Sequence, residues 1–435
     1  MRKVVLILFM MAAVGLAAGN AFVLNSNSQT LSKIDLETGD VDNEFAILGQ
    51  YAASAPNKLE ITDNLAIVTV TYENSVQTID LETGETISFI ALDDSSMPND
   101  LAIYDGNAFI SGNGNSSLYK VNYITEEVIA TASVGLAPQG VEAINGNIWV
   151  ANTGFDINTY QYEPGTISVI NPDDMSLVAT ISTALNPADM IQIDELVYVV
   201  CTGNYGDTAG QVTVVDATSF EIIETIAIGG APASISSNDN KLYMGNSWPA
   251  GVYVYDLATA SVESTPDDAI FVGGNSVNSF EGLLAVIDAV DYIENSIVRF
   301  YNPASHELIA DYEVAVGATD IKFSGSYNSS DDTELVVDLG LSNYPNPFNI
   351  SALNRKSSST TICYKLPDSA QVNVDVYNIK GEKIAQIFDG YQAAGKQQLS
   401  WNGIDKNHKQ VAAGVYLYKL QSGSYQAIQR MVIIK

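Results

Sequence analysis

The sequence predicts an all-β protein, a seven-bladed β-propeller followed by a small Ig-like β-sandwich. Two observations predict the propeller: runs of short strands, and their repetition along the chain. The stretch 187–230 holds four such runs, at residues 190–193, 196–201, 212–216 and 222–228. Each run is rich in β-branched residues and is bounded by Gly, Pro, Asn or Asp. These features favour strands over helices.

Two sequence markers show that this four-strand unit recurs. The third strand of each unit ends in Asp or Asn, at steps of 40 to 49 residues: Asp35, Asp80, Asn122, Asn171, Asp216, Asp256 and Asn302. The first strand follows a Pro or its equivalent: Pro56, Pro98, Pro138, Pro187, Pro232, the region near Gly274, and Ala318. Four strands per repeat of this length are typical of a propeller blade. Both markers count seven, although the weak marker near Gly274 leaves six or eight blades as alternatives.

The repeat region begins and ends out of phase with the unit. It starts in the second strand of a unit, at residues 22–24, and finishes with a lone first strand at 320–323. We expect this last strand to complete the first blade, because a closed ring leaves no open sheet edge.

The ends of the chain predict export. Residues 1–19 have the pattern of a secretory signal peptide, in which Arg2 and Lys3 precede an apolar run and a small-residue cleavage site. The apolar run is too short to span a bilayer, and no later segment is long enough. The predicted plan is a signal peptide at 1–19, a propeller at 20–325, a polar linker at 326–342 and an Ig-like domain at 343–435. Cys201 and Cys363 fall in different domains and are not expected to pair.

The predicted propeller and the C-terminal part of the chain have net charges of opposite sign. Residues 20–340 carry 46 acidic and 6 basic side chains, a net of −40, whereas the chain from Leu341 onward carries 5 acidic and 11 basic ones, a net of +6. Such a propeller repels nucleic acid and anionic membrane surfaces. Two explanations stay open: a solvated exterior that resists aggregation, or a capacity for divalent cations.

Most catalytic constellations are missing. The chain has two histidines, His306 in a turn on the face opposite the variable loops and His408 in the C-terminal domain. Neither a Ser-His-Asp set nor a His-rich metal site is therefore expected on the variable-loop face. No Gly-rich phosphate loop is present. The sequence thus favours a protein that is not an enzyme, with chemistry of carboxylates and Ca²⁺ as the remaining enzymatic alternative.

Ligand-binding residues are predicted on the face that carries the loops between second and third strands. These loops are long at 152–165, 202–210 and 288–296. Loops of this face carry the aromatic candidates Phe155, Tyr160, Tyr162, Tyr205, Trp248 and Tyr292. Aromatic side chains beside carboxylates suit a sugar or a peptide, and aromatics that merely pack their own loops are the alternative.

A second candidate site lies at the mouth of the predicted channel. The residues that start the first strands include Lys58, Asp100, Asp189, Ser234, Ser276 and Asp320. Three carboxylates from separate blades, Asp100, Asp189 and Asp320, are candidate ligands for one Ca²⁺. Lys58 is a competing cation at the same level.

Particular motifs resemble two families. Val169-Ile170-Asn171 with Ala179-Thr180-Ile181, and 214–216 with 224–229, resemble the YVTN-type (surface-layer-type) β-propeller repeats over about residues 21–325. This resemblance implies a secreted or surface propeller without a single activity. Related seven-bladed lactonases and lyases use channel cations or histidines, and the histidines are missing here.

The C-terminal motifs resemble the type A sorting domain of the type IX (Por) secretion system. The residues that carry this resemblance are Tyr344, Pro345, Asn346, Pro347, Gly381, Trp401, Gly414, Tyr416 and Lys435. It implies passage through the periplasm and across the outer membrane, with the type IX machinery as partner. Valines at 372, 374 and 376 alternate with polar residues, which independently predicts an antiparallel sandwich.

The sequence as a whole predicts a secreted or cell-surface propeller that binds a glycan, peptide or protein. Two alternatives are a Ca²⁺-dependent lactonase or lyase that acts at the channel mouth, and a structural component of a surface layer.

Overall fold

The computed structural model describes residues 19–325 except Asp239, Trp248 and Glu281. In the C-terminal part it describes 342–434 with gaps at 347, 350–358, 367–369, 379–382, 394, 407–408 and 423–424. The chain divides into two compact units, Met1–Tyr327 and Asn328–Lys435. Residues 1–18 of the predicted signal peptide, most of the predicted linker, and Trp248, Pro347, Gly381, His408 and Lys435 lie outside the described residues.

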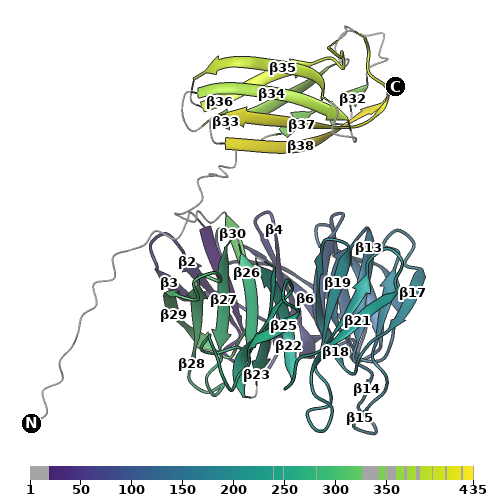
Figure 1. The fold of residues 1–435 in the computed structure, drawn as a ribbon, viewed down its shortest axis with the longest axis vertical. Helices are drawn as coiled ribbons and strands as arrows, with labels where there is room; N and C mark the ends of the chain where they lie inside the picture. The colour runs from purple at the N-terminus through teal and green to yellow at the C-terminus, as the bar shows by residue number, and fades with distance from the viewer. Residues whose placement is uncertain are drawn as a thin grey trace, which may run out of the picture. The chain divides into compact units, whose positions relative to one another are not determined.

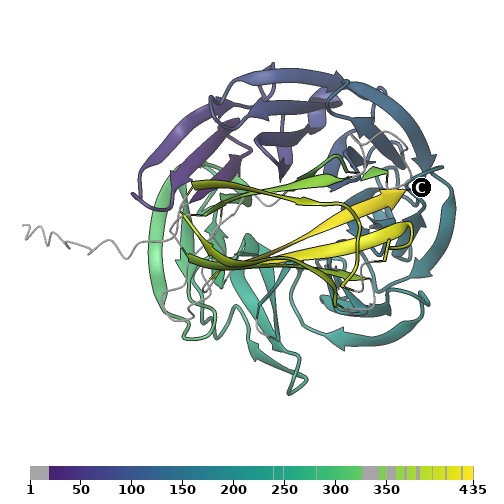
Figure 2. The same ribbon diagram turned by 90° about the horizontal axis from the view of Figure 1, so that it is seen from above.

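Seven four-stranded antiparallel sheets, arranged in a ring, make up the first unit (Figures 1 and 2). Innermost strand first, blade 1 is β30 (Ala318–Gly325), β1 (Gly19–Asn25), β2 (Thr30–Asp35) and β3 (Val41–Ile47). Blade 2 is β4 (Pro56–Thr62), β5 (Leu65–Val70), β6 (Ser75–Asp80) and β7 (Thr86–Ala91). Blade 3 is β8 (Pro98–Tyr104), β9 (Asn107–Gly112), β10 (Ser117–Asn122) and β11 (Glu127–Ser133). Blade 4 is β12 (Pro138–Ile144), β13 (Asn147–Asn152), β16 (Thr166–Ile170) and β17 (Leu177–Ser182).

The remaining blades follow the same plan. Blade 5 is β18 (Pro187–Ile193), β19 (Leu196–Cys201), β20 (Gln211–Asp216) and β21 (Ile222–Ala227). Blade 6 is β22 (Pro232–Asn238), β23 (Lys241–Ser247), β24 (Ala250–Asp256) and β25 (Ser261–Ser264). Blade 7 is β26 (Ser276–Phe280), β27 (Leu283–Asp288), β28 (Asn295–Tyr301) and β29 (Leu308–Val316). The predicted count of seven is confirmed.

The ring closes through blade 1. Strand β1 pairs with β2 on one side and with β30 on the other, and Val23 lies opposite both Ser32 and Ile321. The last strand of the repeat region therefore completes the first blade, as the offset of the sequence markers predicted. Every innermost strand then has a neighbouring blade on each side, and apolar side chains fill the space between blades.

The Asp or Asn marker of each blade has a local physical cause. Oδ1 of Asp35 accepts hydrogen bonds of 2.9 Å from the backbone N–H groups of Glu37 and Thr38. Asn122 accepts the corresponding bonds from Ile124 and Thr125. A side-chain oxygen that bonds the backbone two and three residues later fixes the turn into the outermost strand. The turn needs only consecutive residues, which is why the marker is legible in the sequence.

The outermost strands carry a repeated irregularity. A register shift interrupts the pairing of the third and fourth strands in every blade, for example between Thr78 and Ile79 in blade 2 and between Val214 and Val215 in blade 5. Bulges at sheet edges bend and twist the strand, which hinders edge-to-edge pairing with another molecule.

The long loop of blade 4 contains a short hairpin that the sequence did not reveal. Strands β14 (Phe155–Asp156) and β15 (Gln161–Tyr162) form it and extend beyond the edge of the blades (Figure 1). Oδ1 of Asp156 accepts a hydrogen bond of 2.8 Å from the N–H of Asn158, which shapes the hairpin turn. One further short element, the 3₁₀ helix η1 (Thr71–Glu73), lies between β5 and β6.

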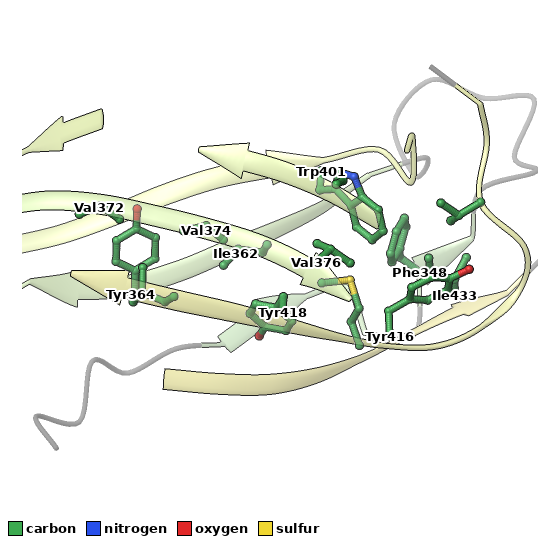
Figure 3. Packing of buried hydrophobic residues seen from close by; sticks show 14 of the residues in the cluster. Phe348, Ile362, Tyr364, Val372, Val374, Val376, Trp401, Tyr416, Tyr418 and Ile433 are labelled. Atoms are coloured by element: carbon green, nitrogen blue, oxygen red, sulfur yellow. The ribbon is translucent and has the colours of Figure 1, made fainter. Parts of the chain in front are cut away.

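The second unit is a β-sandwich. A three-stranded sheet of β31 (Ser342–Tyr344), β33 (Thr360–Leu366) and β36 (Gly395–Trp401) faces a five-stranded one. The latter has the order β32 (Phe348–Asn349), β38 (Tyr425–Ile434), β37 (Gly414–Ser422), β34 (Ala370–Asn378) and β35 (Lys383–Gln392). Figure 3 shows Trp401 beside Phe348 and Tyr416, with ring centroids 5.9 and 6.2 Å apart. The valines predicted to alternate all face this core.

Candidate functional site

One residue near the start of each innermost strand occupies an equivalent place around the channel. It is the third residue of the strand in blades 1 to 6 and the first residue, Ser276, in blade 7. In blades 1 to 7 these ring residues are Asp320, Lys58, Asp100, Gly140, Asp189, Ser234 and Ser276. All except Gly140 line a common cavity. A side chain at Gly140 would meet the backbone oxygen of Ala188 at 2.6 Å, so blades 4 and 5 approach each other closely at the one ring position that has no side chain.

Each aspartate of the ring bonds to the next blade. Asp320 Oδ2 accepts a hydrogen bond of 3.0 Å from the N–H of Leu59. Asp100 Oδ2 accepts one of 3.3 Å from Val141, and Asp189 Oδ2 one of 3.1 Å from Ile235. In blade 6, Ser234 Oγ accepts the corresponding bond of 3.3 Å from Val277. The ring carboxylates therefore bridge neighbouring innermost strands.

The second oxygens of these aspartates are also engaged. Asp100 Oδ1 accepts a hydrogen bond of 2.8 Å from the N–H of Leu101, and Asp189 Oδ1 accepts one of 2.8 Å from Met190. Asp320 Oδ1 lies 3.9 Å from the ammonium nitrogen of Lys58. These bonds fix the orientation of each carboxylate.

Lys58 is the cation among the ring residues. Burial disfavours its ammonium, but the carboxylates of Asp320, Asp100 and Asp189 outweigh that cost and raise the pKa of Lys58 above its usual value. A second ion pair lies two residues further along β4 and β30, where Nζ of Lys322 is 2.5 Å from Oε1 of Glu60. Burial again opposes the charge, and Glu60 raises the pKa of Lys322.

Two carboxyls of the channel are held partly in their neutral form. Burial raises the pKa of Asp100 to about 7, against the opposing effect of Lys58. Burial raises the pKa of Glu142 to about 8, and the nearby charge of Lys322 offsets this only in part. A raised carboxyl pKa within a cavity is a physical indication of a functional site.

Two cavities occupy the channel. The inner chamber, of about 200 Å³, is lined by Lys58, Glu60, Asp100, Glu142, Asp189, Asp320 and Lys322 together with serines of blades 6 and 7. The mouth cavity, of about 190 Å³, is lined by Asn57, Asn99, Gln139 and Tyr205 among others. Lys58, Asp100 and Asp189 line both, so the two cavities adjoin each other.

A third hollow adjoins the mouth. The loop pocket, of about 330 Å³, is formed by Tyr205, Gly206, Thr208 and Ala209 of blade 5 with Gly230 and Ala231 before blade 6. Tyr205 belongs to both the mouth cavity and the loop pocket, and 70% of its surface is exposed. Its ring therefore stands between two hollows on the variable-loop face.

Four of the six predicted aromatics gather in the loops of blades 4 and 5. Phe155 packs against Tyr160 and Tyr162, with ring centroids 6.3 and 5.1 Å apart. Burial raises the pKa of Tyr162, and the nearby Tyr205 adds to the shift. Tyr160 is exposed. Of these four residues, Tyr205 lines the mouth cavity.

Of the other two predicted aromatics, only Tyr292 is described by the structure, and it lies in a different blade. Tyr292 lies in the loop of blade 7, where its hydroxyl accepts a hydrogen bond of 2.8 Å from Asn275 and its carbonyl one of 2.8 Å from Asn27. It therefore helps to hold the junction of blades 7 and 1. Trp248 lies outside the described residues.

The predicted calcium ligands meet as expected but do not make a metal site. Asp100, Asp189 and Asp320 line one chamber. Nevertheless, within residues 19–325 and the described part of the sandwich, no group of three or more His, Cys, Asp or Glu side chains has a geometry that could hold a metal ion. Backbone N–H groups already bind the carboxylate oxygens, and Lys58 provides the counter-charge.

Three charged residues of the chamber were missed in the sequence. Glu60, Glu142 and Lys322 each follow a ring residue by two positions, and alternation along a strand returns them to the channel side. The same period-two rule, applied to every innermost strand, would have identified them.

The residues of the predicted sorting motif have structural roles where they are described. Trp401 and Tyr416 are buried in the sandwich core. Asn346 Oδ1 accepts a hydrogen bond of 2.8 Å from the N–H of Val432, which ties the start of the unit to β38. Gly414 has a φ of +154°, at the limit of the region that favours glycine, where β37 begins. Tyr344 is placed in β31 and Pro345 follows it.

Comparisons with known proteins support the two-part fold. Residues 349–425 match the family of the FlgD Ig-like domain. Hydrazine synthase from Kuenenia stuttgartiensis has a similar structure, with a TM-score of 0.51 and 13% identity over 64% of this chain and 97% of that chain. At this identity the likeness shows the fold alone. No curated protein sequence matches the chain. Among the described residues, no helix has the length and apolarity needed to cross a membrane.

Proposed function

We propose that the protein is an exported β-propeller that binds an extended glycan on its variable-loop face, at the mouth of the channel. The observation that carries this proposal is the position of Tyr205, which is exposed between the mouth cavity and the loop pocket. A long ligand that lies across the aromatic ring of Tyr205 would occupy both the mouth cavity and the loop pocket. An aromatic face beside polar groups is a common way to hold a sugar ring.

The chemistry of the mouth supports a polyhydroxylated ligand. Asn57, Asn99 and Gln139 come from three successive blades and offer amide groups, which both donate and accept hydrogen bonds. The charged groups of Lys58, Asp100 and Asp189 lie below them. Paired donors and acceptors match sugar hydroxyls, while the excess of acid over base on this unit disfavours anionic polymers.

The test is binding of a panel of neutral and amino-containing oligosaccharides to the purified protein, by calorimetry. Tyr205→Ala should weaken binding of any positive oligosaccharide by about tenfold, as expected for the loss of a central aromatic contact. Tyr72→Ala is the matched control, because Tyr72 is 66% exposed on η1 and lines none of the three hollows. Equal losses for both variants, or no bound oligosaccharide, would refute the glycan proposal.

For export, we propose that the C-terminal sandwich is a sorting domain of the type IX secretion system. The match of residues 349–425 to an Ig-like family supports the required fold. The motif residues Trp401 and Tyr416 form part of its core, which links the motif to a folded domain. In a host with type IX secretion, a chain that ends before residue 343 should stay in the periplasm, whereas the full chain should reach the surface or the medium. Equal export of the two chains would contradict this assignment.

The calcium-dependent enzyme is not favoured over binding, because the ring carboxylates already have backbone and lysine partners. A structural role in a surface layer would require ordered self-association. Electron microscopy of the purified protein distinguishes an array from single particles.

A further inference from the structure

The charges of the inner chamber are distributed unevenly around the ring. Blades 1 to 5 supply all of its ionisable side chains, and blades 6 and 7 supply serines and Asn278. On the serine side, Ser236 Oγ accepts a hydrogen bond of 2.8 Å from the N–H of Ser279. The hydroxyl of Ser279 is itself buried and has no partner among the described residues. The chamber thus combines a charged wall with a hydroxyl wall.

The chamber has more carboxyls than lysines. Five carboxyl groups face it, from Glu60, Asp100, Glu142, Asp189 and Asp320, against the two ammonium groups of Lys58 and Lys322. Both lysines already have carboxylate partners. Glu142 has no salt bridge and no hydrogen bond from its side chain among the described residues, although it faces the cavity. The chamber therefore offers no unpaired positive charge to an anionic ligand, whereas the unpaired carboxyl of Glu142 can form an ion pair with a cationic ligand.

The geometry limits the kind of cation. No group of three such carboxylates, within the part of the chain that the structure describes, is close enough for a bare metal ion. A volume of about 200 Å³ is nevertheless large enough for an organic molecule of several heavy atoms. Lys58 provides an internal example, because its primary ammonium is stabilised by the carboxylates of Asp320, Asp100 and Asp189. The ring residues therefore already stabilise one primary ammonium group, that of Lys58.

We propose that the inner chamber binds a primary ammonium group carried on a small hydroxylated body, such as an amino-sugar unit, with Glu142 as its counter-charge and the serines of blades 6 and 7 as partners of its hydroxyls. This inference rests on the proposed glycan function and specifies the ligand: one end unit of the glycan carries a free amine. The remainder of the glycan would extend through the mouth cavity and pass Tyr205.

Such binding must release protons. Without a ligand, burial raises the pKa of Glu142 to about 8 and that of Asp100 to about 7. An ammonium beside these groups favours their ionised forms and lowers both values. The groups that face them are Lys58 and Glu60 on β4, Asp189 on β18, and Asp320 and Lys322 on β30, while β22 and β26 contribute no ionisable side chain. As long as the ligand amine stays protonated, from about pH 6 to 7, the affinity should therefore rise with pH.

The experiment is calorimetric titration of the full protein with glucosamine and with glucose, which differ only in an amine that replaces a hydroxyl. Glucosamine should bind at least about tenfold more tightly than glucose, because only its charge pairs with a carboxylate. Repeating the titration in two buffers with different ionisation enthalpies measures the protons released. Equal affinity for the two sugars, absence of glucosamine binding, or no proton release at pH 7 would each overturn the proposal.

Two variants locate the site. Glu142→Gln should lower the glucosamine affinity by about tenfold and reduce proton release. Glu127→Gln removes the same charge from an exposed position on β11 and should leave both unchanged. An equal effect of the two variants would show only long-range electrostatics and would refute the assignment of Glu142. If Tyr205→Ala weakens oligosaccharide binding while Glu142→Gln does not alter glucosamine binding, the chamber proposal fails and the proposed function stands.

Discussion

The carboxylate of Asp189 in blade 5 accepts a hydrogen bond of 3.1 Å from the backbone N–H of Ile235 in blade 6. The two residues are 46 positions apart in the sequence. Their contact recurs as Asp320 with Leu59 and as Asp100 with Val141, so a single residue position carries a bond between neighbouring blades around the ring.

Replacement of Asp189 by alanine should destabilise the propeller. The change leaves the N–H of Ile235 and the N–H of Met190 without their acceptor, and an unpaired buried donor costs about 1 to 3 kcal/mol. Chemical denaturation of the full chain measures the difference in free energy of unfolding. Asp311→Ala, at an exposed position on the outer strand β29, is the control and should change the stability little. Equal stability of the two variants would contradict a role for the bond.

The stability of the propeller should fall as the pH rises from about 5 to 8. The folded protein keeps protons on Asp100 and Glu142 up to a pKa of about 7 and about 8. The unfolded chain loses these protons near its ordinary carboxyl pKa of about 4, so the folded state binds more protons in this window. Their contribution to stability is therefore complete below pH 4, declines through the window and is lost above about pH 8.

Melting temperatures between pH 5 and 9 test this dependence. Glu142→Gln carries no titrating group at this position, so its melting temperature should vary less with pH than that of the natural protein. The exposed turn aspartates, such as Asp216, whose pKa is lowered by backbone N–H groups of Ser219 and Thr218, affect stability only at more acidic pH. An identical pH profile for the two proteins would show that Glu142 does not titrate in this range.

Calcium should not stabilise the propeller. A site-bound ion raises the melting temperature by mass action and saturates with concentration. The ring carboxylates are bonded to backbone N–H groups and to Lys58, so a bound calcium ion would have to displace those partners. The melting temperature in calcium and in chelator, at matched ionic strength, should agree. A saturable rise that disappears in Asp189→Asn would contradict this expectation.

Removal of the closing strand should disrupt the ring. A chain that ends after Val316 lacks β30, which leaves β1 without its inner partner and removes the buried side chain of Ile321. An unpaired edge next to an exposed core promotes aggregation. Size-exclusion chromatography and a thermal melt should show aggregation or a broad transition, whereas a chain that ends after Gly325 should melt cooperatively. Monomeric, cooperative behaviour of both chains would count against closure through blade 1.

Trp401→Ala should unfold the C-terminal unit selectively. Trp401 is 5% exposed and packs between Phe348 and Tyr416, and loss of a buried Trp side chain costs about 3 to 5 kcal/mol. Calorimetry of the full chain should show a lower transition for the sandwich and an unchanged one for the propeller. Tyr391→Ala, at a position that is 71% exposed, should leave both transitions in place. A shift of the propeller transition in Trp401→Ala would indicate that the two units do not unfold independently.

Much of the fold is legible in the sequence because its causes are local. The turn after each third strand needs only an Asp or Asn and the two or three residues that follow, as Asp35 and Asn122 show. The sequence thereby determined the blade count and most strand boundaries in blade 5. The hairpin β14–β15 escaped prediction because its two-residue strands are too short to establish a period.

The candidate site depends on ring order and on strand register. The sequence identified Asp100, Asp189 and Asp320 as ring residues, but their partners in the following blades are backbone groups that lie 41, 46 and 261 residues away along the chain. Glu142 and Lys322 come near one another only because β30 returns from the end of the repeats to blade 1. Composition and local pattern thus determined the propeller and the presence of channel charges. Closure of the ring alone decided which charges are paired and which carboxyl is left facing the cavity, because pairing requires contact between strands that are distant in the sequence.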